Sequence, residues 1–200
     1  MKKIVMSLFA MLIFVGVSSQ GYKVGDNAVD FELKNVDGKM ISLKEYNNAK
    51  GFIIVFTCNT CPYALAYEDR LLTINKKFET KGFPVIAINP NDPEVQPADT
   101  YDKMIIKSKE KNFNFPYLYD PGRKISSIYG ATKTPHIYLL SKSGNNLKVE
   151  YIGAIDDNFE EASAVKTPYL ENAIEALLAG KKPNPDFTKA IGCSVKKKST

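Results

Sequence analysis

Two cysteines separated by two residues, Cys58 and Cys61, stand in the stretch FTCNTCPY and carry the clearest chemical signal in this sequence. An apolar run, GFIIVFT, leads into them and a segment with helical periodicity follows, which predicts a strand-to-helix junction. Unpaired N–H groups and the dipole at a helix N-terminus lower a cysteine pKa from about 8.5 to the range ~3.5–7.5. Such a thiolate attacks disulfides and a second sulfur nearby releases the product, so the spacing predicts a redox pair.

Two other uses of the cysteine pair are open. A purely structural disulfide would close a very short loop, and the entropic stabilisation from a disulfide grows with loop length. A metal site needs further ligands, which His136 and Cys193 could supply. Asp156 and Asp157 in GAIDDN could also bind a metal, although Asp-Asp-Asn before a helix is more often turn and cap chemistry. We predict no metal and no organic cofactor.

Strands and helices that would position the cysteines alternate along the chain. Alternating residues around Asp37-Gly38 predict an N-terminal β-hairpin. Continuous apolar runs at 51–57 and 83–89 predict strands buried on both faces. We expect further strands at 115–120, 135–140 and 146–153, and helices at 61–81, 98–111, 122–129 and about 164–179. This pattern predicts an α/β fold with a mixed sheet flanked by helices.

Three features after residue 130 bear on the cysteine pair. Thr134-Pro135 stands directly before the strand HIYLL, and a proline there is a candidate for a cis peptide, with a trans proline as the alternative. His136 could lie near the pair and transfer protons, or point to the opposite face of the sheet. Cys193, in AIGCSVKKK, either returns to the pair as an additional resolving thiol or is a small buried hydrophobe.

Residues 1–19 have the arrangement of a secretory signal. Lys2 and Lys3 precede an apolar run at 4–17, which is shorter than the ~20 residues needed to span a bilayer, and small residues follow. We expect cleavage near Ser19, no stable membrane insertion afterwards, and a periplasmic or extracellular location in which disulfides persist. A single domain is expected at 22–182, with a C-terminal tail at 183–200.

The charge of the chain argues against a nucleic-acid partner. The net charge is +5 and falls to +3 when the two leader lysines are removed, and much of the excess lies in three lysines at 196–198. No basic stripe with interleaved aromatic residues is present, so a solvated tail explains these lysines better. Three cysteines are too few to staple a chain of 200 residues, so the fold must depend on an apolar core.

Taken together, these features resemble the thioredoxin-fold redoxins, specifically the peroxiredoxin-like, AhpC/TSA-related group that carries a Cys-x-x-Cys motif. The resemblance runs from VGDNAVDFELKNVDGKMISL to AIGCSVK and rests on CNTCPY, FPYLYDP, TKTPHIYLL, YIGAIDD and GCSVK. It implies a thioredoxin-like fold with an N-terminal hairpin extension. It also implies that Cys58 attacks, that Cys61 resolves, that Pro135 is cis, and that the backbone of Thr134 positions an extended substrate.

The sequence departs from the peroxiredoxin pattern around the reactive position. Cys61 stands where those enzymes have their peroxidatic cysteine, but the threonine position three residues earlier is Cys58, and Thr57 is one residue out of register. The region of the expected arginine reads Thr134-Pro135. The donors that would polarise a peroxide are therefore missing. Thr60 replaces the histidine of many strongly oxidising members, which predicts a reductant or a mild exchanger.

We therefore predict an exported thiol–disulfide oxidoreductase that exchanges electrons through a Cys58–Cys61 disulfide. Its expected partners are protein or small-molecule thiols and disulfides, with a reductase or a membrane electron donor to recycle the pair. One alternative is a thiol peroxidase that uses Cys61, with Cys193 resolving. A second alternative is a metal- or copper-binding module that uses Cys58, Cys61 and His136.

Overall fold

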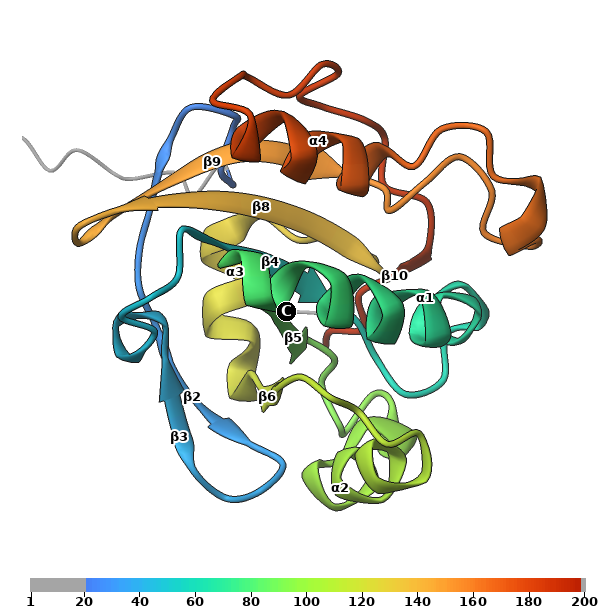
Figure 1. The fold of residues 1–200 in the computed structure, drawn as a ribbon. Helices are drawn as coiled ribbons and strands as arrows, with labels where there is room; N and C mark the ends of the chain where they lie inside the picture. Colours follow the sequence, from blue (N-terminus) through green and yellow to red (C-terminus); the bar gives the residue numbers. More distant parts are fainter. Residues whose placement is uncertain (1–20, 199–200) are drawn as a thin grey trace, which may run out of the picture.

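A mixed β-sheet of eight strands organises residues 21–198, which are the residues that the computed structural model describes (Figure 1). The strand order across the sheet is β1-β9-β8-β4-β5-β6-β2-β3. The strands are β1 Asn27–Ala28, β2 Glu32–Asn35, β3 Met40–Ser42, β4 Gly51–Phe56, β5 Val85–Asn89, β6 Tyr117–Tyr119, β8 His136–Ser143 and β9 Asn146–Gly153. A separate ribbon pairs β7 Lys133–Thr134 with β10 Cys193–Ser194. The predicted leader at 1–19 lies outside the described residues.

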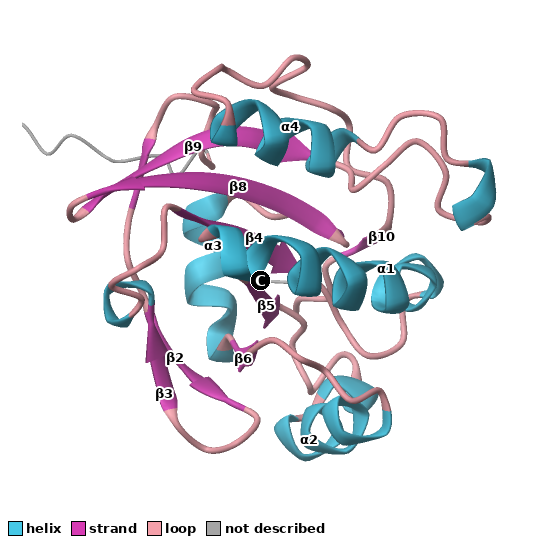
Figure 2. Cartoon of the chain, viewed as in Figure 1, coloured by secondary structure: helices cyan, strands magenta, loops and turns pink. Residues whose placement is uncertain are grey.

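Helices cover both faces of this sheet, as Figures 1 and 2 show. The helices are α1 Pro62–Phe78, α2 Tyr101–Glu110, α3 Lys124–Tyr129 and α4 Tyr169–Leu178. Helices α1 and α4 pack on one face, whereas α3 packs on the other. Among residues 21–198, no helix has the length and apolar character needed to cross a membrane.

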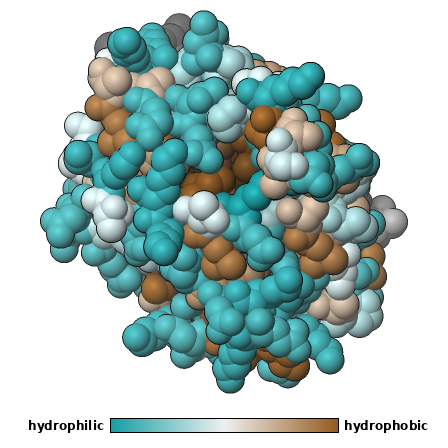
Figure 3. Space-filling view, turned by 45° about the vertical axis from the view of Figure 1, so that its right-hand side comes forward, coloured by the Kyte–Doolittle hydropathy of each residue, from teal (hydrophilic) through white to brown (hydrophobic). Residues whose placement is uncertain are grey.

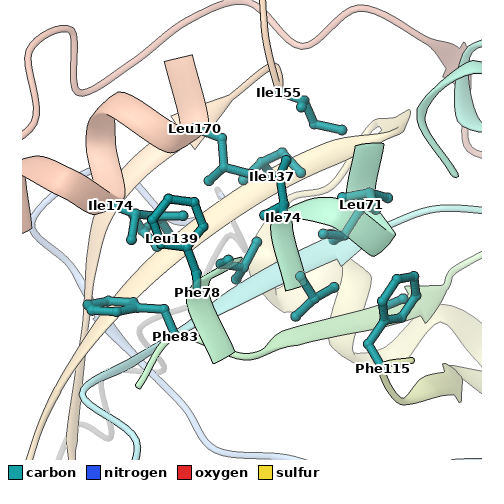
Figure 4. Packing of buried hydrophobic residues seen from close by; sticks show 14 of the residues in the cluster. Leu71, Ile74, Phe78, Phe83, Phe115, Ile137, Leu139, Ile155, Leu170 and Ile174 are labelled. Atoms are coloured by element: carbon teal, nitrogen blue, oxygen red, sulfur yellow. The ribbon is translucent and has the colours of Figure 1, made fainter. Parts of the chain in front are cut away.

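Strand β4 lies in the middle of the sheet, and every one of its residues is buried. It pairs in parallel with β5 and antiparallel with β8, so both of its edges are satisfied. Ile53 and Val55 belong to the cluster under α1 and α4, while Phe52, Ile54 and Phe56 belong to the cluster on the other face. Figure 4 shows part of the first cluster, including Leu71, Ile74 and Phe78 of α1 with Leu170 and Ile174 of α4.

The predicted α/β fold is confirmed, including its thioredoxin-like arrangement of a mixed sheet between helices. The hairpin expected around Asp37-Gly38 is also present, as the antiparallel pair β2 and β3. The last helix was predicted to begin near Ala164, and this boundary is wrong. Residues 162–164 form only a short 3-10 turn, and α4 begins at Tyr169 directly after Pro168. Proline disfavours helical geometry in the residue before it, which moves the helix start past Pro168.

Much of the predicted C-terminal tail packs onto the sheet. Thr188 accepts a hydrogen bond from the Ala154 N–H (2.9 Å), and its own N–H donates to the Ile152 carbonyl (3.0 Å). Further along, the Lys196 carbonyl accepts from the Asp92 N–H (3.0 Å). The expectation of a solvated tail is therefore wrong for the backbone at Lys196, although the side chains at 196–198 are exposed.

Candidate functional site

Cys58 and Cys61 lie in the short connection between β4 and α1. Cys61 is the N-cap residue of α1, with an extended backbone (φ −66°, ψ 123°), and Pro62 is the first helical residue. A proline is well suited to this position because the first N–H groups of a helix have no intrahelical partner. Both cysteines are only 5% exposed and contact each other and Ala64. The strand-to-helix junction is therefore where the sequence predicted it.

Thr134 contacts both sulfur atoms of the pair. Its peptide bond to Pro135 is cis, as expected from the sequence. The Thr134 hydroxyl lies 3.3 Å from Cys58 Sγ, and the Thr134 carbonyl accepts a hydrogen bond from the Cys61 thiol (3.1 Å). Thr134 itself is fully buried. One residue from a distant part of the chain thus fixes the positions of both thiols.

Cys193 is the third member of this cluster. Strand β10 pairs antiparallel with β7, and the register places Cys193 opposite Thr134. Cys193 packs against the Cys58–Cys61 pair, and both its thiol and its backbone N–H face Cys61 Sγ. A cleft of about 140 Å³ is lined by all three cysteines together with Thr134. Of the two positions that the sequence left open for Cys193, the structure has the one beside the pair.

All three cysteines are free thiols, and their pKa values are shifted in different directions. Hydrogen bonds donated by the Cys58 thiol, and then by the Cys193 thiol, lower the pKa of Cys61 below its ordinary value against the opposing effect of burial. The same hydrogen bond to Cys61, together with burial, raises the pKa of Cys58 above its ordinary value. Burial and donation to Cys61 also raise the pKa of Cys193. Cys61 is thus the sulfur that holds a negative charge most easily, and its contact with the Thr134 carbonyl belongs to the protonated form.

A buried carboxylate network beside Cys58 was missed in the sequence. Asp99 is fully buried and accepts from the Asn59 N–H (2.7 Å), Asn91 Nδ2 (2.7 Å) and Asn89 Nδ2 (3.3 Å). Its negative charge contributes to the raised pKa of Cys58. Asn89 is the last residue of β5 and Asn91 lies two residues beyond it, but nothing in the sequence brings Asn59 and Asp99 together with them.

The remaining candidate residues lie around or away from the cleft. Thr57 is buried at the end of β4, and its N–H donates to the Ile88 carbonyl (2.9 Å). Thr60 is exposed at the rim and accepts from Gln96 Nε2 (2.9 Å). His136 lines a different pocket, of about 530 Å³, with Tyr138 and Ile152, so it does not reach the cysteines.

Metal ligands are not assembled in the part of the chain that the structure describes. No group of three or more histidine, cysteine or acidic side chains there could hold a metal ion. Asp156 instead accepts hydrogen bonds from the Tyr67 hydroxyl (2.6 Å) and Arg70 (2.7 Å). Asp157 accepts from the N–H groups of Lys166 and Thr167 (3.0 Å each). Both carboxylates therefore hold the loop after β9, in agreement with turn and cap chemistry.

A Cys-x-x-Cys pair at a helix N-terminus, facing a cis-proline on a thioredoxin-like sheet, is the arrangement of a thiol redox protein. Comparison with known families agrees with this class. The chain belongs to the AhpC/TSA family, whose sequence profile matches residues 24–152.

Individual relatives come from two functional groups. The thiol-disulfide oxidoreductase ResA of Halalkalibacterium halodurans is 26% identical over 139 residues, which cover 70% of this chain and 74% of that protein. A Mycobacterium tuberculosis protein named as a peroxiredoxin is 27% identical over 118 residues, covering 57% and 68% of the two chains. Among solved structures, an uncharacterised conserved protein of Geobacillus kaustophilus is similar with a TM-score of 0.81 and 33% identity, covering 90% of this chain and 95% of that one. Membership of the family and the names of these relatives support an oxidoreductase activity for the chain.

Proposed function

We propose that this protein is a thiol–disulfide oxidoreductase that cycles between a Cys58, Cys61 dithiol and a Cys58–Cys61 disulfide. The observation that carries the proposal is the contact of Thr134 with both sulfurs at the start of α1. This contact holds two thiols side by side in a cleft that a small substrate group can enter. The thiol-disulfide oxidoreductase relative supports the same chemistry.

The electrostatics of the pair favour Cys61 as the attacking sulfur, which reverses the roles expected from the resemblance. Cys61 caps the N-terminus of α1 and two neighbouring thiols pack against it, and each of these features stabilises a thiolate. Cys58 instead faces the negative charge of Asp99. The attack therefore begins at the sulfur with the lower pKa.

The reaction then proceeds in two exchange steps. The Cys61 thiolate attacks one sulfur of a substrate disulfide, forming a mixed disulfide and releasing the first substrate thiolate. Cys58 loses its proton and attacks the Cys61 sulfur, which forms the Cys58–Cys61 bond and releases the second substrate thiolate. Two electrons pass from the protein to the substrate, and an external dithiol returns them in the reverse sequence. The Thr134 hydroxyl donates to the Cys58 sulfur as it acquires charge.

Export is part of this proposal. The leader pattern at 1–19 supports secretion, and a secreted dithiol would work where disulfides are stable. The partners in this setting are thiol or disulfide substrates and a reductase or membrane donor that restores the dithiol. A dithiol site of this kind needs neither a metal nor an organic cofactor.

The test is a redox titration of residues 20–200 in defined thiol buffers, with alkylation trapping and peptide mapping of the paired sulfurs. We expect reversible formation of the Cys58–Cys61 bond at a potential between about −270 and −120 mV, in wild type and in Cys193→Ser. In the reduced protein, iodoacetamide should modify Cys61 faster than Cys58 at pH 7, and the Cys61 rate should fall only at a pH below the ordinary cysteine pKa of about 8.5. A Cys58–Cys61 bond that does not form in Cys193→Ser would refute the proposal.

A thiol peroxidase is the second candidate, and the low pKa of Cys61 beside Cys193 is the observation that favours it. In that case, hydrogen peroxide would oxidise Cys61 to a sulfenic acid and Cys193 would condense with it, releasing water. The test compares second-order rates of Cys61 oxidation by hydrogen peroxide and by a peptide disulfide. A rate with peroxide that exceeds the disulfide rate would replace the oxidoreductase proposal by the peroxidase one.

A further inference from the structure

The segment Gly192–Lys196 lies along the cleft as an added strand. Cys193 pairs with Thr134 and Ser194 with Lys133 in the β7–β10 ribbon, and the Val195 N–H donates to the Thr132 carbonyl (3.1 Å). In Figure 1 this ribbon lies where β8 begins and beside the start of α1. The backbone edge next to the cysteine pair is therefore already occupied by the chain's own C-terminal segment.

The other side of the same segment is held as well. The Lys196 N–H donates to Asn91 Oδ1 (2.8 Å), and the Lys196 carbonyl accepts from the Asp92 N–H (3.0 Å). Val195, the residue before Lys196, is buried, at 9% exposure. Figure 3 shows the molecule turned toward this side, where apolar side chains are visible among hydrophilic ones. Hydrogen bonds on two sides thus give the segment a fixed position.

Gly192 is required for the close approach of this segment to the cis peptide. A Cβ atom at this position would lie 2.2 Å from the Thr134 carbonyl oxygen and 3.1 Å from the Pro135 nitrogen. Both atoms belong to the backbone and cannot move aside as a flexible side chain could. A larger residue at 192 would therefore lift the segment away from Thr134, and Cys193 with it.

An extended substrate that brings a sulfur to Cys61 needs the same backbone edge, because strand addition is the simplest way for an extended chain to dock beside a sheet. We propose that Gly192–Lys196 is a built-in substrate strand and that Cys193 is a third redox-active cysteine, which exchanges disulfides with Cys61. This inference rests on the proposed oxidoreductase function and adds a second internal disulfide to it. Cys61 is central because its sulfur contacts both other thiols.

The exchange is a rearrangement without net electron transfer. The Cys193 thiolate attacks the Cys61 sulfur of the Cys58–Cys61 disulfide, so the Cys61–Cys193 bond forms and the Cys58–Cys61 bond breaks. The proton lost by Cys193 is taken up by the Cys58 thiolate. Cys193 is more exposed than the other two cysteines, so an external dithiol can then attack its sulfur and reduce the protein. The strand therefore carries the disulfide from a buried pair to the surface.

The experiment uses Cys58→Ser, in which only the proposed second disulfide can form within the cleft. Oxidised glutathione is added, and the products are trapped by alkylation and mapped by mass spectrometry under non-reducing conditions. We expect one peptide pair that links Cys61 to Cys193, with two molecules of reduced glutathione released per protein. The double variant Cys58→Ser/Cys193→Ser should instead retain a glutathione mixed disulfide on Cys61. Persistence of that mixed disulfide in the single variant, with Cys193 still a free thiol, would overturn the inference.

This experiment can fail while the test of the proposed function succeeds, because the two use different variants and different disulfides. Formation of Cys58–Cys61 in Cys193→Ser tests the oxidoreductase, whereas formation of Cys61–Cys193 in Cys58→Ser tests the built-in strand. Success of the first with failure of the second would leave an oxidoreductase whose Cys193 takes no part in exchange.

The position of the strand is tested by Gly192→Ala in the Cys58→Ser background. We expect the Cys61–Cys193 bond to form at least about tenfold more slowly, because the displaced Cys193 no longer contacts Cys61. The matched control is Ile191→Ala, an exposed neighbour in the same segment, which should leave the rate within about twofold. Circular dichroism would show that both variants are folded. Equal rates of Cys61–Cys193 bond formation in the two variants would show that the exchange does not depend on the position of the strand.

Discussion

Thr134 is the residue on which the geometry of the cysteine pair depends most directly. Its hydroxyl acts to lower the pKa of Cys58, against the hydrogen bond to Cys61 and burial, which raise it. The hydroxyl lies 3.3 Å from Cys58 Sγ in a fully buried position, where water cannot replace it. Loss of this group should therefore affect Cys58 without changing the shape of the site.

We predict that Thr134→Val raises the pKa of Cys58 and slows its attack on a mixed disulfide at Cys61 by about tenfold, since a hydrogen bond to a charged group contributes ~1.5–3 kcal/mol. The aromatic disulfide dithionitrobenzoate gives a direct measurement in the Cys193→Ser background. Its first thiolate is released by Cys61 and its second by Cys58, so the second phase reports the resolving step.

Thr132→Val is the matched control for this prediction, because it makes the same chemical change at an exposed position two residues away. The second phase should keep its wild-type rate in this control. A second phase that is equally fast in Thr134→Val would show that the hydroxyl does not assist Cys58.

The sequence predicted the position of the cysteine pair better than it predicted its surroundings. The apolar run before the cysteines and the helical periodicity after them were sufficient to place Cys58 and Cys61 at the start of a helix. The network around Asp99 could not be predicted, because it depends on amide side chains from separate segments meeting in three dimensions. The fit of Gly192 against Thr134 was equally invisible, since these residues are distant in sequence.

At the scale of elements, Asp156 connects α1 to the loop that follows β9. The carboxylate accepts from the Tyr67 hydroxyl and from Arg70 of α1, and Arg70 also donates to the Phe159 carbonyl (2.9 Å). Asp156 is 5% exposed and the Arg70 side chain 15% exposed, so water contributes little to either group. The loop therefore depends on a buried ion pair for its position.

We predict that Asp156→Ala lowers the free energy of unfolding by about 3 kcal/mol, because removing one partner leaves a buried charge uncompensated. Urea unfolding followed by circular dichroism measures the change. Asp157→Ala should cause a clearly smaller loss, since Asp157 is exposed and accepts hydrogen bonds mainly from backbone N–H groups. Equal losses in the two variants would contradict the role of the ion pair.

Elements with many apolar residues were predicted well, whereas the two-residue ribbon of β7 and β10 was not. The wholly apolar runs of β4 and β5 leave little choice but a buried strand, and both are present. Strand β10 has only two residues and no periodicity, so its pairing with β7 could not be predicted. The early start assigned to α4 followed apolar spacing and overlooked Pro168.

At the scale of the whole molecule, His136 makes stability depend on pH. It is the only histidine in the chain, and burial lowers its pKa from 6.5 to about 4. Its Nδ1 atom has no hydrogen-bond partner among residues 21–198. The charged residues that line its pocket are Lys23, Lys133, Asp186 and Lys189. The folded chain therefore resists protonation of a group that the unfolded chain protonates readily.

Between pH 6.5 and pH 4, the unfolded chain binds a proton at His136 that the folded chain does not bind, so acidification favours unfolding. We predict that this group alone removes about 3 kcal/mol of stability across that window. His136→Phe should flatten the pH dependence by that amount, as measured by urea unfolding at pH 7, 5.5 and 4. Parallel stability curves for the variant and wild type would contradict the prediction.

The strand order of the sheet also determines when folding can finish during synthesis. Gly51 in the central strand pairs with Ser141, and Asn27 pairs with Lys148, so neighbouring strands are far apart in the sequence. Contacts between distant segments form slowly and need both partners to be available. A nascent chain that has emerged only as far as β6 still lacks β8 and leaves one edge of β4 open. Because the sheet cannot be completed until β8 is available, such a chain would stay unfolded and could pass through a translocation channel, as the proposed export requires.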